Sequence, residues 1–100
     1  MYIIREVMHC KPGKVKVMVE KFKAMKVLMD RSGGPKMRFM TDVSAERYWT
    51  IVTEMEVETL DNFMAMGDMS EDDKKAMGEI MKDYHDLVLR GRREIYKLEG

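Results

Sequence analysis

The sequence predicts an α+β domain in which helices cover one face of a four-stranded antiparallel sheet. Residues 46–57 are rich in aromatic and β-branched side chains, which is typical of a strand. Residues 15–31 and 77–88 carry apolar side chains at helical spacing, which indicates amphipathic helices. The chain has 100 residues, enough for one hydrophobic core. We therefore expect residues 1–100 to form a single domain around the strand at 46–57.

Turn and cap signals divide the chain into these elements. Pro12 and Gly13 mark a turn before the first helix, and Gly33 and Gly34 end that helix. Ser70 is placed to cap the last helix. The expected elements, in chain order, are a strand at residues 2–9, a helix at 15–31, strands at 36–41 and 46–57, a short helix from 59, a helix from 71 to about 90, and a strand at 92–98.

The two faces of the expected sheet differ in character. Side chains alternate along a strand, so Trp49, Ile51 and Met55 would face the helices. Helices can cover only one face with this order of elements. The other face would be too apolar to leave in water, so we expect two copies to pack sheet to sheet as a homodimer. The expected dimer interface consists of Ile3, Val7, Tyr48, Thr50 and Val52.

Composition argues against several classes of protein. The net charge is zero, and the basic-Gly-aromatic string of an RNA-recognition motif is missing around residues 47–50, so no nucleic-acid partner is expected. No apolar run reaches the roughly 18 residues of a membrane span, and the N-terminus lacks a signal-peptide pattern. A cytoplasmic protein is therefore expected. His9 and Cys10 would point to opposite faces of a strand, so we expect no metal site.

Two short motifs resemble a known family. The turn Lys11-Pro12-Gly13-Lys14 follows the first strand, and the aromatic strand Tyr48-Trp49-Thr50-Ile51-Val52 precedes residues 56–63. With the order of elements, they are similar to the dimeric α/β-barrel superfamily of ferredoxin-like fold. The similarity is greatest to its antibiotic-biosynthesis-monooxygenase-like (ABM-like) and NIPSNAP-like branches. The resemblance implies a βαββααβ chain, a barrel built from the sheets of two subunits, and ligands between sheet and helices.

The haem-degrading branch of that superfamily resembles this chain in layout but relies on an Asn, a Trp and a His that this chain does not match. Glu6 falls near the Asn position, and Phe63 and Met66 lie where the Trp should be. No His occurs early in the helix expected after Ser70. We therefore expect no haem, and no other cofactor.

The candidate site lies between the sheet and the helices. His85 is a candidate general base, because histidine titrates near neutral pH, and Glu6 would be a carboxylate in apolar surroundings. Structural alternatives stay open for both: a boundary histidine held by hydrogen bonds, and an ion pair between Glu6 and Arg47 or Arg93. Methionine stripes are usually core, but flexible methionines also suit an adaptable pocket. The expected ligand-binding residues are Trp49, Met55, Met77, Met81 and Tyr84.

Two hypotheses about function follow from these patterns. In the first, the protein is a dimer that binds a small apolar or aromatic molecule, and the resemblance implies a cofactor-independent monooxygenase or isomerase of aromatic or polyketide-like compounds. In the second, it is a non-catalytic interaction domain whose sheet faces serve only assembly. A pocket lined by Trp49, methionines, Glu6 and His85 would favour the first hypothesis, and a filled core would favour the second.

Overall fold

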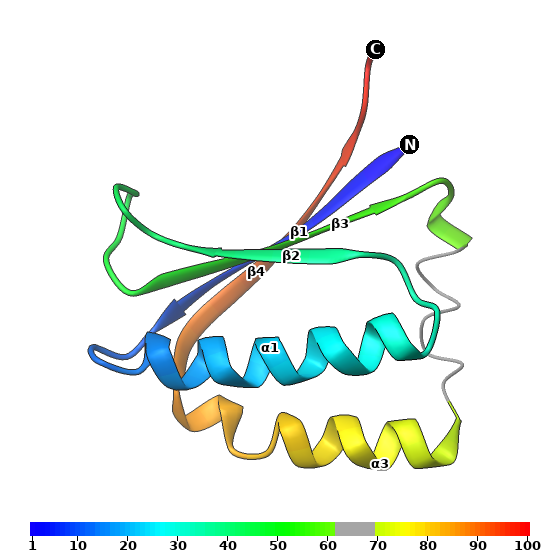
Figure 1. Ribbon diagram of the computed structural model, residues 1–100. Helices are drawn as coiled ribbons and strands as arrows, with labels where there is room; N and C mark the ends of the chain where they lie inside the picture. Colours follow the sequence, from blue (N-terminus) through cyan, green and yellow to red (C-terminus); the bar gives the residue numbers. More distant parts are fainter. Residues whose placement is uncertain (62–69) are drawn as a thin grey trace.

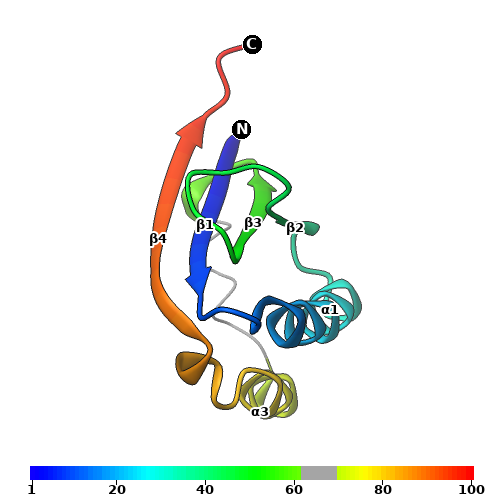
Figure 2. The same cartoon turned by 90° about the vertical axis from the view of Figure 1, so that its left-hand side faces the viewer.

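The computed structural model describes residues 1–61 and 70–100, which form a four-stranded antiparallel sheet with helices on one face (Figure 1). The elements are β1 (Tyr2–Cys10), α1 (Val15–Arg31), β2 (Met37–Thr41), β3 (Thr50–Val57), α3 (Glu71–Ile80), the short 3-10 helix η2 (Tyr84–Asp86) and β4 (Val88–Lys97). Figure 2 shows α1 and α3 side by side beneath the sheet. The predicted ferredoxin-like class is confirmed. No helix in the described part of the chain is long and apolar enough to cross a membrane.

The strand order is β2-β3-β1-β4, so β1 and β3 are central, as predicted. Residues directly opposite each other in an antiparallel pair share a face. Ile4 pairs with Met55, and Met55 pairs with Met37, so these three lie on the face toward the helices, which we call the helix face. The opposite side, the open face, carries Ile3, Arg5, Val7, His9, Arg38, Met40, Thr50, Val52, Glu54, Glu56, Arg90, Arg92, Glu94 and Tyr96.

The core lies between α1 and the helix face. A turn places the helix: the Lys14 N–H donates to the Lys11 carbonyl at 3.0 Å, and Gly13 has a φ of 77°, which favours glycine. Gly33, also at φ 77°, lies just beyond the end of α1. The buried core cluster consists of Cys10, Met18, Phe22, Met29, Met37, Ile51 and Met55. The methionine stripe of α1 is therefore part of a packed core.

The central strand starts later than predicted. β3 begins at Thr50, and residues 46–49 form a bend before it. Asp42 closes the loop, because its carboxylate accepts a hydrogen bond from the Thr50 N–H at 2.8 Å and its own N–H donates to the Thr50 carbonyl at 3.2 Å. Trp49 has a φ of 60°, in the left-handed region, so it cannot continue the strand. The predicted placement of Trp49 on the helix face and of Tyr48 in the strand was wrong.

The last helix ends earlier than predicted. α3 stops at Ile80, and β4 begins at Val88, because residues from Val88 onward pair with β1 (Cys10 opposite Val88). The Lys21 ammonium donates to the Ile80 and Lys82 carbonyls at 3.1 and 2.7 Å, which satisfies carbonyls left free at the end of α3.

The start of α3 agrees with the sequence. Ser70 caps it, since the Asp73 N–H donates to the Ser70 hydroxyl at 3.1 Å. The Asp73 carboxylate also accepts from the Ser32 hydroxyl at 2.8 Å, which ties the start of α3 to the end of α1. The short helix predicted after Thr59 extends into residues outside the described part of the chain.

Candidate functional site

The predicted general base lies at the surface. His85 belongs to η2 and is exposed, and its ring centroid lies 4.0 Å from that of Tyr84. Because α3 has ended before this point, His85 is not on a continuous helix with Met81, as the sequence had indicated. Asp83, at φ 64°, redirects the chain between them. The exposed position of His85 therefore agrees with the alternative of a boundary histidine.

Glu6 lies on the helix face, as predicted, and has an arginine partner. The Arg93 guanidinium donates to the same Glu6 carboxylate oxygen from Nε, at 2.8 Å, and from Nη2. Arg93 lies directly opposite Glu6 across the β1–β4 pair, and the Glu6 side chain is about a quarter exposed. The structure therefore agrees with the ion-pair alternative, with Arg93 as the partner.

The predicted ligand-binding residues divide into two groups. Met55 is in the core cluster, and Met77 and Tyr84 pack against it. Met81 is half-buried outside that cluster, and Trp49 is 44% exposed in the bend before β3. The structure brings three of the five residues into one packed core and leaves Trp49 at the surface.

The described residues form an open groove of about 520 Å³ near the start of β2 and the end of β3. Methionines supply its apolar part, and Lys26, Lys36 and Arg38 bring cations to it. Of the predicted ligand-binding residues, only Met55 lines it. The lining residues are Met1, Ile3, Lys26, Lys36, Met37, Arg38, Glu54, Met55 and Glu56.

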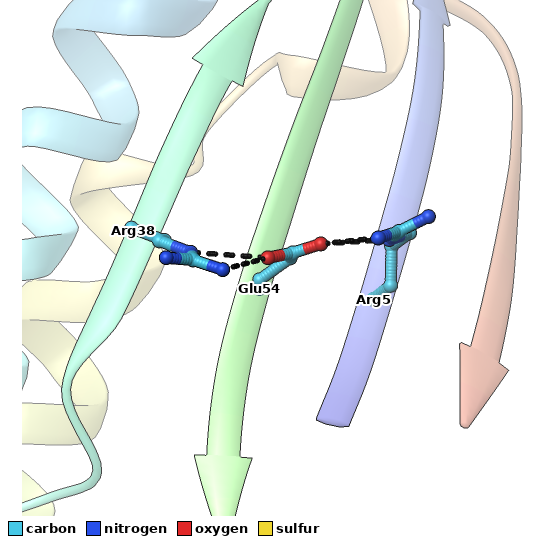
Figure 3. A network of polar contacts seen from close by, with 3 residues as sticks. All are labelled: Arg5, Arg38 and Glu54. Carbon is cyan, nitrogen blue, oxygen red and sulfur yellow. Dashed lines mark hydrogen bonds and ion pairs between the residues drawn. The ribbon is translucent and has the colours of Figure 1, made fainter. Parts of the chain in front are cut away.

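A buried carboxylate forms one wall of this groove. Glu54 is 7% exposed, and it lies between Arg5 and Arg38 on the open face (Figure 3). Arg5 donates to Glu54 Oε2 from Nε and Nη2, at 2.8 and 2.5 Å. Arg38 donates to Glu54 Oε1 from Nε and Nη2, at 3.0 and 2.7 Å. Each guanidinium thus holds one carboxylate oxygen, and Arg5 also lies 5.7 Å from the centre of the Tyr96 ring.

These contacts set the charge of Glu54. Hydrogen bonds from Arg38 are the largest cause that lowers the pKa of Glu54; burial acts in the opposite direction, and Arg5 lowers the pKa further. The carboxylate therefore stays ionised although it is buried. The sequence analysis missed this network. Its signal was an acidic residue at the centre of a strand with arginines on two other strands, but only the register shows that the three lie in one row.

A Glu54→Gln variant should lose about 2 kcal/mol of unfolding free energy at pH 7, because it replaces charge-assisted hydrogen bonds with weaker ones. The folded-state pKa of Glu54 lies below its ordinary value of 4.5. Its contribution is therefore fully present above about pH 4.5 and is lost as the pH falls through the folded-state pKa. Urea unfolding at pH 7 and pH 3 measures both effects.

The matched control for that variant is Glu56→Gln, which changes an exposed carboxylate on the same strand and face. We expect the two variants to differ at pH 7, and the difference to shrink as the pH falls towards 3. Equal stability at pH 7 would show that the network does not stabilise the fold.

No group of three or more His, Cys, Asp or Glu side chains in residues 1–61 and 70–100 has the arrangement of a metal site. Cys10 is buried on the helix face, and burial raises the pKa of its thiol, with Asp42 adding to the shift. His9 lies on the open face, as strand alternation requires. The His9 and Cys10 side chains therefore lie on opposite faces of the sheet.

Comparison with known proteins gives matches at the level of structure. No family model matches the chain, and no curated protein sequence matches it either. A NIPSNAP domain protein from Burkholderia xenovorans superposes with a TM-score of 0.75 at 10% identity, covering 99% of this chain and 95% of that one. A candidate antibiotic biosynthesis monooxygenase from Nitrosomonas europaea gives 0.71 at 15% identity and covers 97% of both chains.

A third similar structure is a dimeric protein of unknown function and ferredoxin-like fold from Bacteroides fragilis. Its TM-score is 0.67 at 15% identity, covering 97% of this chain and 96% of that one. At such low identity, structural likeness shows a shared fold and not a shared activity. The chain therefore has the ferredoxin-like fold, in an architecture similar to that of NIPSNAP-like and ABM-like structures.

Proposed function

We propose that the protein is a homodimeric interaction domain that assembles through the open face of its sheet. The observation that carries this proposal is the composition of that face. Ile3 and Val52 are half-buried in the single chain, and Met40 and Tyr96 are 41% and 49% exposed. Apolar side chains exposed between the charged residues of a sheet face, with no described helix over them, are typical of an interface.

The ion pairs on the open face are compatible with burial in a dimer. The Glu54 carboxylate already has both oxygens bonded, so covering it leaves no unsatisfied acceptor. The stems of Arg5 and Arg38 add apolar surface beside it. The dimeric state of the similar Bacteroides fragilis structure supports a dimer.

The positions of the two predicted catalytic residues, and of Trp49, which was predicted to bind ligand, also support an interaction domain over an enzyme. Glu6 is occupied by Arg93, His85 is exposed in η2, and Trp49 lies in the bend before β3. A general base must lie within hydrogen-bond reach of its substrate in a site that holds both. These three side chains do not form such a site.

Sedimentation equilibrium at micromolar concentration tests the proposal. The expected mass is twice the 11.8 kDa of one chain. A single species of 11.8 kDa over the whole concentration range would contradict it.

A second candidate function is binding of a small apolar or aromatic molecule. The more specific form of this candidate is a cofactor-independent monooxygenase or isomerase that acts on that molecule. The open groove favours it, because methionines line the groove beside Lys26 and Lys36. The likeness to the Nitrosomonas europaea structure supports the same candidate.

Naphthol is a suitable probe of this second candidate. If the groove binds it, the melting temperature should rise with naphthol concentration by mass action, and Lys26→Glu should reduce that rise. The control is Lys23→Glu, on the same helix but outside the groove lining. Oxygen consumption in the same samples would report monooxygenase activity. An unchanged melting temperature up to the solubility limit of naphthol would contradict the candidate.

A further inference from the structure

A second polar constellation lies on the open face, at the end of the sheet where β1 stops and β3 and β4 start. His9 lies opposite Thr50 on β3 and opposite Arg90 on β4. Arg92 lies opposite Val7, one step further along the same face. The bend before β3 brings in Arg47, whose carbonyl accepts a hydrogen bond from the Thr50 hydroxyl at 2.8 Å. We call these residues the His9 site: His9, Arg47, Thr50, Arg90 and Arg92.

Hydrogen bonding determines which nitrogen of His9 is free. The only hydroxyl hydrogen of Thr50 goes to the Arg47 carbonyl, so Thr50 Oγ1 must accept from His9 Nδ1, at 3.1 Å. In the neutral ring Nε2 then carries a lone pair. No described residue bonds Nε2, and no buried side-chain nitrogen or oxygen in the described part lacks a partner, so Nε2 reaches the surface. His9 as a whole residue is 7% exposed, and its ring is oriented by Thr50.

The surroundings of His9 are strongly cationic. Burial is the largest cause that lowers the pKa of His9, followed by the guanidinium groups of Arg47, Arg92 and Arg90; Glu46 acts in the opposite direction. Arg92 also donates to Glu94 at 3.2 Å. Three cations therefore act on one neutral imidazole; of the carboxylates near them, Glu46 opposes their effect on His9, Glu94 pairs with Arg92, and Asp42 is bonded to the Thr50 N–H. An anion placed among them would gain attraction from all three.

The same bend exposes two aromatic side chains. Tyr48 is 84% exposed and Trp49 is 44% exposed. Trp49 is held in the left-handed region, at φ 60°, while its carbonyl accepts from the Cys10 N–H at 2.8 Å and Asp42 closes the loop from the other side. Backbone strain that the surrounding structure maintains is often found at ligand-contacting segments. Arginine and exposed aromatic side chains together suit an aromatic anion.

We propose that the His9 site binds a small hydroxylated aromatic carboxylate. The carboxylate pairs with the guanidinium groups of Arg47 and Arg90, and the ring hydroxyl donates a hydrogen bond to His9 Nε2. The aromatic ring packs against the bend that carries Tyr48 and Trp49. This binding goes beyond the proposed interaction function. The His9 site lies at one end of the open face, so a dimer interface that reaches that end would compete with the ligand.

The probe is 3-hydroxybenzoate, whose meta hydroxyl cannot bond its own carboxylate; benzoate and phenol are matched controls that lack the hydroxyl and the carboxylate. Titrations followed by the NMR signals of the His9 ring and of the indole N–H of Trp49, the only tryptophan, should show saturable shifts with 3-hydroxybenzoate. We expect 3-hydroxybenzoate to bind about five- to tenfold more tightly than benzoate, the value of one hydrogen bond to Nε2. Phenol should give no saturable shift. Equal affinity for 3-hydroxybenzoate and benzoate, or no shift with either, would overturn the proposal.

Substitutions separate the two contacts. Arg47→Ala, in an exposed loop, should weaken binding of 3-hydroxybenzoate and of benzoate alike by about tenfold, while Arg31→Ala, the same loss of charge on α1, should weaken neither. His9→Asn keeps a donor near Thr50 but removes the Nε2 acceptor, so the affinity for 3-hydroxybenzoate should fall to that for benzoate. If Arg47→Ala leaves the affinity unchanged, or if Arg31→Ala lowers it equally, the anion is attracted to the protein non-specifically and the proposed site is wrong. Sedimentation of the same samples reports the oligomeric state separately, so a failure of ligand binding is not confused with a failure of dimerisation.

Discussion

A Val52→Asp variant should sediment as a monomer under conditions in which the natural protein is a dimer. Val52 lies near the centre of the open face, between Val7 on β1 and Met40 on β2. It is half-buried in the single chain, so the new carboxylate reaches water in the monomer. In the dimer it would be an unpaired buried charge, at a cost of several kcal/mol in each chain. The dissociation constant should therefore rise on the order of a thousandfold.

The matched control is Val27→Asp, because Val27 is 68% exposed on α1, away from the sheet. This variant should remain a dimer with the affinity of the natural protein. Far-UV circular dichroism should show that both variants keep their fold. If Val52→Asp dimerises normally, or if Val27→Asp dissociates equally, the open face is not the interface.

A Phe22→Ala variant should lose about 3 kcal/mol of unfolding free energy, with a melting temperature lower by more than about 10 °C. Phe22 is 2% exposed in the middle of α1, and its ring centroid lies 6.0 Å from that of Phe39. Its removal leaves a cavity among four buried methionines of the core cluster: Met18, Met29, Met37 and Met55. Flexible methionines can partly fill that space, so the loss should lie at the low end of the usual range for Phe→Ala.

The control for core packing is Val17→Ala, since Val17 is 45% exposed on the same helix. Its effect on the unfolding free energy should stay within about 0.5 kcal/mol. A loss near 5 kcal/mol for Phe22→Ala would show that the methionines cannot rearrange. A loss below about 1 kcal/mol would mean that Phe22 does not fill the core. Thermal and urea unfolding of the three proteins distinguish these outcomes.

Local patterns were sufficient for the elements that depend on short stretches of chain. The helix predicted at residues 15–31 is α1 with the same bounds, because its apolar stripe and the glycines after Arg31 act within a few residues. The Ser70 cap was likewise predictable, since the hydroxyl and the Asp73 N–H that it accepts from are three residues apart. The alternation that placed Ile51 and Met55 on the helix face also held.

Contacts between distant residues decided the rest. Asp42 ends the ladder at Thr50 and leaves Trp49 outside the strand, despite the β propensity of that stretch. The helical spacing of apolar residues predicted a helix up to about residue 90. Val88 instead pairs with Cys10, so β4 begins there.

By itself, the sequence determined the type and order of the elements, the ferredoxin-like class and the two faces of the sheet. Only the tertiary structure decided that Glu54 lies between Arg5 and Arg38, and that His9 lies among Arg47, Arg90 and Arg92. The physical reason is the range of each interaction. Hydrophobic period and capping act between neighbours in the chain, whereas partners of a polar side chain depend on strand register, which residues far apart establish together.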